Sequence, residues 1–426
     1  MRGFKRFFKI NIHAFIFGLF GVLVLWGLHL LPVNQIFIDP FSEAIKQHDI
    51  MDITFSRFRE HNDPKLLDKD IVIINNSITE NGRLAKTLTL LSKLKVKAIG
   101  LDIVLDSLTS KLKPEDTLLS KAISSVGNIV LANTFQEKTE KTTGFSNIQP
   151  DSFYSKGKTV GHVNLATNDG FSVRAFEPFH EINGNKESAF SVQLAKMCYP
   201  DKLHFIENRK HAKEWINFRR LQPGFASMIY PINSDSATHY RMVEMNQLLA
   251  DSNLYKENEF FRDKIVLIGY IGEDVRYLSM HDRYFTPLNE QYIGRSIPDM
   301  SGVVIHANIL SMIRDNDYIN DVPNYTLYLI MLFIFYFNYQ IFTWIEFKFH
   351  RAGGVIIRLF QVCEFILLFF GAIYLLLNLN LKMALFMSAT AIVLSFELFE
   401  IYKKRLEKGI DMFFAKLIEK IFAAID

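Results

Sequence analysis

The sequence predicts an α/β extracytoplasmic domain with a largely parallel sheet and flanking helices, together with four transmembrane α-helices. Two observations lead to this fold class. Four stretches are apolar over roughly 20 residues, the length at which a helix crosses the hydrocarbon core of a bilayer. Between the first and the second stretch, short β-branched runs alternate with amphipathic helical patterns, as they do in successive βαβ units.

The composition agrees with a chain that is part globular and part membrane-embedded. Of its 426 residues, 49% are hydrophobic and 39 are phenylalanine, which is unusual for a soluble globular protein. The net charge of +3 gives no support for a nucleic-acid partner. The two cysteines, Cys198 and Cys363, lie far apart in different kinds of sequence, so they indicate neither a disulfide framework nor a metal-ligand spacing.

The four apolar stretches are expected at residues 13–32, 325–345, 355–377 and 381–399. The first has a basic front like a signal peptide, but no small-residue cleavage site follows it, so we expect a retained signal anchor. Three short basic flanks are MRGFKRFFK before the first stretch, KFHR between the second and third, and KKR after the fourth. All three fall on one side if the chain crosses four times, and the positive-inside rule makes that side cytoplasmic.

We therefore expect four regions. Residues 1–32 form a basic N-terminus and the first span, residues 33–323 an extracytoplasmic domain, residues 324–400 three further spans, and residues 401–426 a cytoplasmic amphipathic helix. With both termini in the cytoplasm, the large domain is expected on the other side of the membrane. The tail carries apolar residues on one helical face and mixed charges on the other, so it should lie on the inner membrane surface or pack against a protein.

Strands and helices alternate in the first part of the domain. The runs DIVIINN (residues 70–76), AIGLDIVL (98–105) and NIVLANT (128–134) are short and apolar, as strands buried on both faces are. Helical periodicity follows the first two strands, with leucines on one face over residues 82–95 and Pro114 near the start of the second helix.

The second part of the domain is less regular. Residues 135–160 are polar and lack periodicity, which indicates an exposed loop. Residues 160–179 alternate and turn at the letters NDG, which is a hairpin signal. The remaining expected elements are a helix at 187–197, strands at 228–233 and 264–272, and a final helix from Ser301.

Seven segments, in this order, resemble the second CHASE domain family of cyclase/histidine-kinase-associated sensory extracellular domains. They are DIVIINN, AIGLDIVLDS, NIVLANT, GHVNLATNDGFSVRAF, FRDKIVLIGYIG, DRYFTP and SGVVIHANILSMI. The resemblance covers residues 35–320 and implies an extracytoplasmic sensor of a bacterial receptor, of a kind that usually continues into a cytoplasmic kinase or nucleotide cyclase. Only about 25 residues follow the fourth span, too few for such a domain, so we expect the output to come from another chain or to be lost.

Asp102 and Asp106 lie at the end of the second expected strand, where open α/β sheets place ligands. If both belong to the strand, carboxylates four residues apart point to the same face and could bind a cation or a basic ligand. The alternative is that one of them caps the next helix and the other accepts hydrogen bonds from loop amides.

Asp282 and Thr286 follow another expected strand, in the letters HDRYFTP, and with Asp102 they could form a metal or polar-ligand site. A loop held by side-chain hydrogen bonds explains the same letters. Asn164 is a further ligand-binding candidate, because it and Arg174 could reach a pocket from the expected hairpin.

His306 stands alone among apolar residues of the final helix, which Ser301 is expected to cap. A lone histidine in this position is usually a core residue bonded to a nearby carbonyl or carboxylate. The helix is expected to end near Arg314, a short distance in sequence from the second span. His306 is therefore also a candidate ligand-binding residue within an element that passes a movement to the membrane.

Several polar residues lie inside the expected spans, where they need partners. Arg358 and Glu397 are expected at similar depth and could form a pair, with snorkelling of each to the interface as the alternative. Glu364 lies deeper, where Asn338 or Gln340 could donate a hydrogen bond to it.

The sequence favours a non-enzymatic receptor that relays ligand or envelope state through its spans to a separate cytoplasmic or membrane protein. No hydrolase, zinc-protease, phosphate-loop or dinucleotide motif is present, and no pattern identifies a cofactor. Two alternatives remain: a scaffold subunit of an envelope complex, and an extracytoplasmic enzyme that uses Asp102, Asp282 and His306. The expected partners are the lipid bilayer, the relay protein, a small-molecule ligand and a second copy of the chain.

The crossing count can be tested with a cysteine placed at Ser236. A membrane-impermeant thiol reagent should label it on intact cells whose outer membrane, where there is one, has been opened. If the thiol reacts only after the inner membrane is lysed, the four-span topology is wrong.

Overall fold

The computed structural model describes residues 2–30, 49–60, 64–77, 80–105, 112–137, 145–148, 150–167, 172–182, 184–221, 240–257, 259–272, 282–289 and 297–423. The chain falls into two compact units. One is an α/β unit, Met51–Ile319, and the other is a helical unit formed by Met1–Ile50 and Asn320–Asp426.

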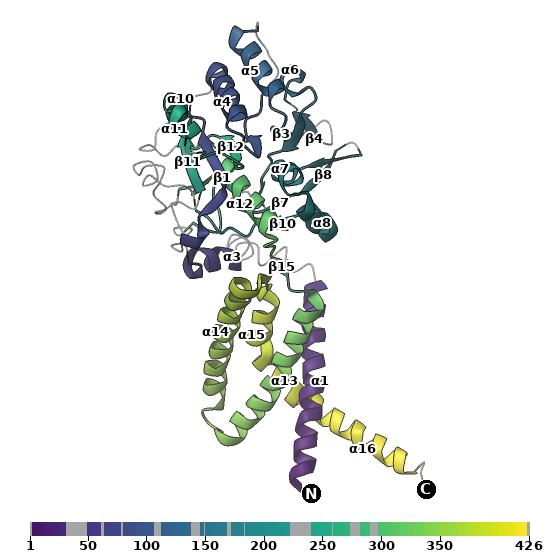
Figure 1. The fold of residues 1–426 in the computed structure, drawn as a ribbon. Helices are drawn as coiled ribbons and strands as arrows, with labels where there is room; N and C mark the ends of the chain where they lie inside the picture. Colours follow the sequence, from purple (N-terminus) through teal and green to yellow (C-terminus); the bar gives the residue numbers. More distant parts are fainter. Residues whose placement is uncertain are drawn as a thin grey trace. The chain divides into compact units, whose positions relative to one another are not determined.

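The α/β unit is built on a sheet in the order β11-β1-β12-β2-β3-β4, with β5 also paired to β3 (Figure 1). The pairs β11–β1, β1–β12, β12–β2, β2–β3 and β3–β5 are parallel, and β3–β4 is antiparallel. The prediction of a largely parallel sheet with flanking helices is thereby confirmed. The strands are β1 (Asp68–Asn75), β2 (Ala98–Leu101), β3 (Ile129–Glu137), β4 (Phe145–Ile148), β5 (Thr159–His162), β11 (Tyr240–Glu244) and β12 (Ile265–Gly269).

Helices and short strands surround this sheet. The helical elements are α3 (Ile50–Ile53), the π-helix η2 (Thr54–Phe58), η3 (Pro64–Leu66), α4 (Asn81–Lys93), α5 (Pro114–Ser125), α6 (Ser152–Ser155), α7 (Phe190–Cys198), α8 (Pro200–Arg209), α10 (Met245–Ala250), α11 (Ser252–Glu257) and α12 (Gly302–Asp315). The short strands are β6 (Ala166–Thr167), β7 (Val173–Phe176), β8 (Phe179–Ile182), β9 (Asn185–Ser188), β10 (Glu214–Trp215), β13 (Arg283–Tyr284) and β14 (Met300–Ser301).

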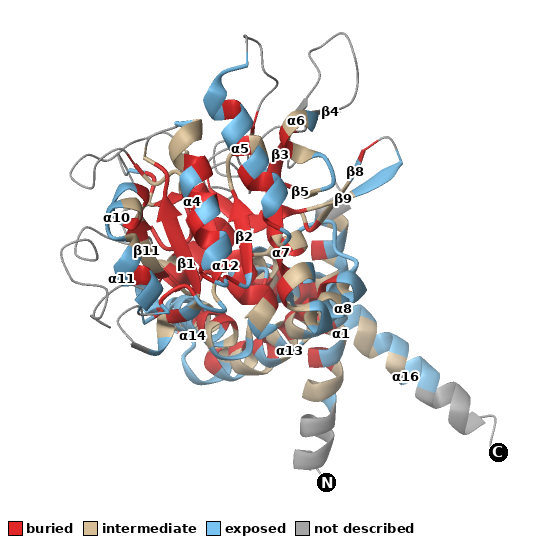
Figure 2. Ribbon diagram, turned by 45° about the horizontal axis from the view of Figure 1, so that its top comes forward, coloured by how far each residue is buried: buried red, intermediate tan, exposed pale blue. Residues whose placement is uncertain are grey.

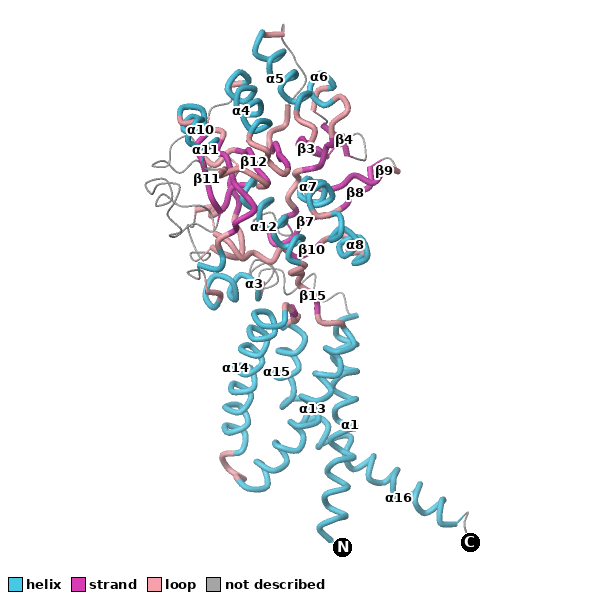
Figure 3. The backbone as a smooth tube through the Cα atoms, in the orientation of Figure 1, coloured by secondary structure: helices cyan, strands magenta, loops and turns pink. Residues whose placement is uncertain are grey.

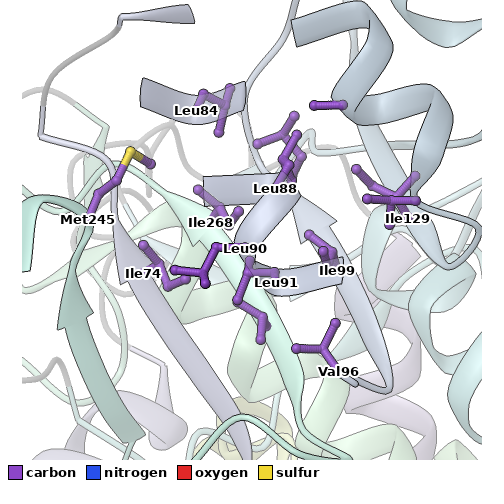
Figure 4. Packing of buried hydrophobic residues seen from close by; sticks show 14 of the residues in the cluster. Ile74, Leu84, Leu88, Leu90, Leu91, Val96, Ile99, Ile129, Met245 and Ile268 are labelled. Atoms are coloured by element: carbon purple, nitrogen blue, oxygen red, sulfur yellow. The ribbon is translucent and has the colours of Figure 1, made fainter. Parts of the chain in front are cut away.

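The central strands are buried because helices cover both faces of the sheet. Every residue of β2 and β12 is buried, and Figure 2 shows the buried sheet. On one face, Ile74, Ile99 and Ile268 join a cluster with Leu88 and Leu91 of α4 (Figure 4). The leucine periodicity of the sequence therefore marked the buried side of this helix.

Helices α7 and α12 cover the opposite face, toward which the alternate strand residues point. A Cβ added to Gly100 of β2 would lie 2.8 Å from side-chain atoms of Phe190 and Leu194 in α7. A Cβ added to Gly269 of β12 would lie 2.7 Å from the Cβ of Val303 in α12. Glycine at these two strand positions lets the helices approach the sheet closely.

Some expected boundaries are wrong. The expected loop at residues 135–160 contains the end of β3, all of β4 and α6, and the start of β5. Strand β4 gains its hydrogen bonds from antiparallel β3, and a local sequence pattern does not show such a pairing. The hairpin expected at 160–179 is represented by antiparallel β6 and β7, whereas the letters NDG and the strand expected at 228–233 lie outside the described residues.

In its described residues, the helical unit consists of long helices and one pair of short strands (Figure 3). Four segments of its described residues are long and apolar enough to cross a membrane: Lys9–Leu28, Asn324–Lys348, Gly353–Leu379 and Leu385–Leu417. The elements are α1 (Arg2–Leu30), β15 (Asn320–Asp321), α13 (Asn324–Lys348), α14 (Gly353–Leu379), β16 (Leu381–Lys382), α15 (Leu385–Ile401), the π-helix η4 (Tyr402–Leu406) and α16 (Glu407–Ala423).

Small residues and polar pairs hold this unit together. Gly18 and Gly21 of α1 bring that helix against α13, where a Cβ on Gly18 would lie 2.8 Å from Leu332. Arg358 pairs with Glu397 at 2.5 Å, as the sequence suggested.

Glu364, which the sequence predicts to lie deeper in the membrane than Glu397, also has a partner. Asn338 donates a 3.1 Å hydrogen bond to Glu364. Of the two donors considered from the sequence, Gln340 instead donates to Asn11 of α1, at 3.2 Å. Polar side chains of α13 therefore bond two different neighbouring helices, which fixes its rotation in the bundle.

A buried ion pair fixes the start of the α/β unit. Arg174 of β7 binds Asp52 of α3 with Nε at 2.9 Å from Oδ1 and Nη2 at 2.8 Å from Oδ2. The two side chains are 3% and 4% exposed. Removing one member of such a pair leaves an uncompensated buried charge.

We therefore expect Asp52→Ala to lower the free energy of unfolding of the α/β unit by about 3–5 kcal/mol. Glu80→Ala breaks an exposed pair with Arg83 and should cost at most about 1 kcal/mol. Pulse proteolysis in urea on the full-length chain measures both. Equal small losses in the two variants would show that the buried pair is not a constraint on the fold.

Candidate functional site

The candidate site lies at the carboxyl ends of β2 and β12. Asp102 follows the last residue of β2, and its backbone N–H donates a 2.8 Å hydrogen bond to the carbonyl of Ile268 in β12. Asp282 precedes β13 with a left-handed φ of 53°. In parallel sheets ligands bind at this edge, because the loops that follow the strands converge there.

The N-terminus of α12 meets Asp282. The N–H of Gly302 donates to the carbonyl of Asp282 at 3.2 Å. A Cβ added to Gly302 would lie only 3.0 Å from Oδ1 of Asp282. Glycine therefore leaves room for the carboxylate to lie against the positive end of the helix dipole.

Asp102 and Asp282, which we call the acid pair, influence each other electrostatically. Burial and, secondly, the negative charge of Asp282 raise the pKa of Asp102 to about 8. Burial and then the acid pair raise the pKa of the Tyr284 hydroxyl, which hydrogen-bonds Asp282. At neutral pH Asp102 is therefore mainly protonated, which relieves its repulsion by Asp282.

This arrangement can bind a cationic group or exchange a proton, and protonated Asp102 can donate a hydrogen bond. Among the described residues, no group of three His, Cys, Asp or Glu side chains is placed to hold a metal ion.

Asp106 lies outside the described residues. A ligand shared by Asp102 and Asp106 therefore stays a prediction. Its geometric premise is wrong, because β2 ends at Leu101 and Asp102 already lies beyond the strand. The alternation of side chains along a strand therefore does not apply to these two carboxylates.

Thr286 holds a loop. Its N–H and hydroxyl donate to Oδ1 and Oδ2 of Asp299, and its hydroxyl accepts from the N–H of Leu288 at 3.3 Å. Asn289 donates to the same carboxylate at 3.3 Å. Burial raises the pKa of Asp299 to about 6, and the bonds from Thr286 oppose this. These contacts are the side-chain bonding that the sequence offered as the alternative to a ligand role for Thr286.

Asn164 is exposed and joins the segment after β5 to β3. Its Oδ1 accepts from the backbone N–H of Phe135 at 2.8 Å, and its Nδ2 donates to the carbonyl of the same residue at 3.0 Å. The hydroxyl of Thr134 donates a 3.3 Å hydrogen bond to the same Oδ1. All of these partners belong to β3, so the structure does not join Asn164 to the acid pair.

His306 is buried on α12 and bonds to groups of the neighbouring elements. Its Nδ1 lies 3.3 Å from the hydroxyl of Ser191 in α7, and its ring packs edge-on against Phe190 at 5.4 Å. Burial lowers the pKa of His306 to about 4, and a hydrogen bond to the Val163 carbonyl opposes this only in part. His306 thus bonds Ser191 and Val163 rather than either carboxylate of the acid pair.

A second buried histidine was missed by the sequence reasoning. His162, the last residue of β5, is 2% exposed, and neither ring nitrogen has a hydrogen-bond partner in the described part of the chain. Its ring lies 5.0 Å from that of Phe135 and 6.4 Å from that of His180. Burial, then the charges of His180 and His306, lower the pKa of His162 to about 3. The available signal was its place at the end of an apolar strand.

Ser301 occupies the N-cap position of α12, as expected, although its side chain makes no capping hydrogen bond. Ser301 instead pairs with Arg283 between β14 and β13. This pairing is what brings Asp282 to the start of α12.

Comparison with models of protein families matches residues 32–340 to the CHASE2 domain. The match covers the α/β unit from its first to its last residue. No curated protein matches the chain. No solved structure matches it either.

The protonated state of Asp102 gives a pH-dependent prediction. A carboxyl whose pKa rises on folding stabilises fully below its ordinary value of 3.8 and loses that contribution as pH rises through about 8. Asp102→Asn should therefore gain stability relative to the unmodified chain as pH rises from 5 to 9, by up to about 1.4 kcal/mol per pH unit. Melting temperatures at pH 5, 7 and 9 measure this, with exposed Asp263→Asn as the control. A pH-independent difference would contradict it.

Proposed function

The chain belongs to the CHASE2 domain family, and on that premise we propose that it is a receptor of a bacterial inner membrane that signals to a separate cytoplasmic partner. In this proposal the α/β unit faces the periplasm or the exterior, and both termini are cytoplasmic. Support comes from the sensory character of the family and from four apolar helices of membrane-spanning length. The proposal assigns no catalytic reaction, because His306 bonds Ser191 and Val163 rather than the acid pair.

The continuity of α12 carries this proposal. Its first residue, Gly302, contacts Asp282 of the acid pair, and its last, Asp315, is separated only by residues 316–323 from α13. Every residue from Gly302 to Ile313 is buried. A packed helix moves as one piece, so a change at the acid pair reaches the segment that enters the membrane helix.

The C-terminal end of α12 is anchored by charge. Arg314 binds Asp68 at 3.0 Å and Asp70 at 3.3 Å, both in β1. Ser311, one turn earlier, donates to the other oxygen of Asp68 at 3.0 Å. These bonds hold α12 in one position against β1, and a ligand that favours another position of the helix would have to break them.

In the helical unit, side-chain contacts join α16 to α1. Asp411 of α16 pairs with Lys9 at 2.6 Å and with His13 at 3.1 Å. Beyond this tie, Met412 and Phe413 are each 62% exposed. We place the contact with the cytoplasmic partner on this part of α16, since a displacement of α1 or α15 moves it directly.

The relay is tested by capturing the partner. The full-length chain, crosslinked in native membranes, should co-purify with a cytoplasmic protein, and Phe413→Glu should reduce its yield at least about tenfold because a charge enters the apolar contact. Phe413→Leu keeps the apolar surface and should retain the partner, as should Leu118→Glu on α5.

Equal recovery from Phe413→Glu and Phe413→Leu would remove α16 as the output. Recovery of no protein from any of these preparations would remove the relay itself.

A further inference from the structure

Arg59 is a buried cation for which the described residues provide no acidic partner. It is 9% exposed, and its guanidinium lies 3.5 Å from the ring centroid of Phe55. Its Nη1 donates to the carbonyl of Phe218. Its Nε and Nη2 are buried and make no hydrogen bond within the described part of the chain.

The two unpartnered atoms form one edge of the guanidinium group. Their N–H bonds point in parallel, and this edge binds two oxygens of a carboxylate or a phosphate. Two other arginines of the α/β unit bind a carboxylate through the same edge. Arg174 uses it to bind both oxygens of Asp52. Arg219 uses it to bind Asp317, at 2.7 and 3.1 Å.

The surroundings of Arg59 favour an anion. A buried charge without a counter-charge is strongly unfavourable. Burial and then the positive charge of Arg219 lower the pKa of Arg59 well below its ordinary value, and Asp317 offsets this only in part. An anion bound by Nε and Nη2 would offset the desolvation and the repulsion together.

The backbone that presents Arg59 is unusual. It follows the π-helix η2, and its N–H donates to the carbonyl of Thr54 at 3.0 Å. The Thr54 hydroxyl is also buried without a hydrogen bond in the described chain. π-turns are rare and occur frequently at functional sites.

The residues around Arg59 connect it to α12. Phe218, which accepts its hydrogen bond, lies in a segment that Asn308 of α12 holds. Asn308 accepts from the N–H of Arg220 at 3.1 Å and donates to its carbonyl at 3.0 Å. An anion bound by Arg59 therefore acts on the segment packed along α12.

We propose that the Nε/Nη2 edge of Arg59 binds an anion that presents two oxygens, a carboxylate or a phosphate, and that this anion is a ligand of the α/β unit. The inference deepens the proposed function and rests on it, because the anion is a signal only if the chain is a receptor. The shared chemistry admits two sources, a soluble anion and a lipid headgroup.

The test uses the full-length chain in nanodiscs of phosphatidylcholine, purified in chloride buffer. Inorganic phosphate or acetate at 100-fold its Kd should raise the Tm of the α/β unit by about 5 °C. Arg59→Met should show no shift. Arg262→Met, at an exposed arginine, should show the full shift. In chloride alone Arg59→Met should melt no lower than the unmodified chain, because it removes an unpaired buried charge.

Nanodiscs that contain phosphatidylglycerol separate the two sources. A shift of Arg59-dependent melting in these discs alone identifies a lipid headgroup, whereas a shift with phosphate or acetate in phosphatidylcholine identifies a soluble anion. No shift in any condition, or equal shifts in the unmodified chain and in Arg59→Met, would overturn the inference.

The melting measurement involves no partner. Anion binding without partner capture would therefore leave this site standing and remove the relay, and the reverse result would do the opposite.

Discussion

The enclosure of α12 is the constraint on which the α/β unit depends. A helix that is apolar on all sides must be surrounded, and here the sheet, α7 and the segment around Phe218 surround it. Its few polar side chains then require partners. His306 is hydrogen-bonded to Ser191, and Ser311 donates a hydrogen bond to Asp68. These bonds give an otherwise featureless apolar helix one rotation and one depth.

Buried charge is concentrated around the end of this helix. Burial raises the pKa of Asp68, but Arg314 and then Arg220 outweigh it, so the pKa lies below its ordinary value. Arg219 and Asp317 form a second pair nearby in sequence. Such pairs add little net stability compared with apolar side chains, but they define a geometry sharply. A geometry that charge defines is also one that a charged ligand can alter.

Much of the fold follows from local sequence, whereas the site does not. The leucine period of α4 and the apolar runs of β1 and β12 show their burial directly in the letters. Strand β4 could not be found, since only its distant partner makes it a strand. Asp102 was singled out from its place after a strand, and the structure adds Tyr284 beside Asp282. No local pattern in the sequence marks Arg59, because its distinguishing feature is that its buried Nε and Nη2 have no hydrogen-bond partner in the described part of the chain.

The π-helix η4 between α15 and α16 has a geometric consequence. A π-turn contains one residue more than an α-turn, so closing it would rotate everything that follows by about 100° about the helix axis. The exposed side chain of Phe413 would then point in a different direction, with no bond broken in α16 itself. The five residues of η4 are thus enough to convert a small movement of α15 along its axis into a rotation of the exposed surface of α16.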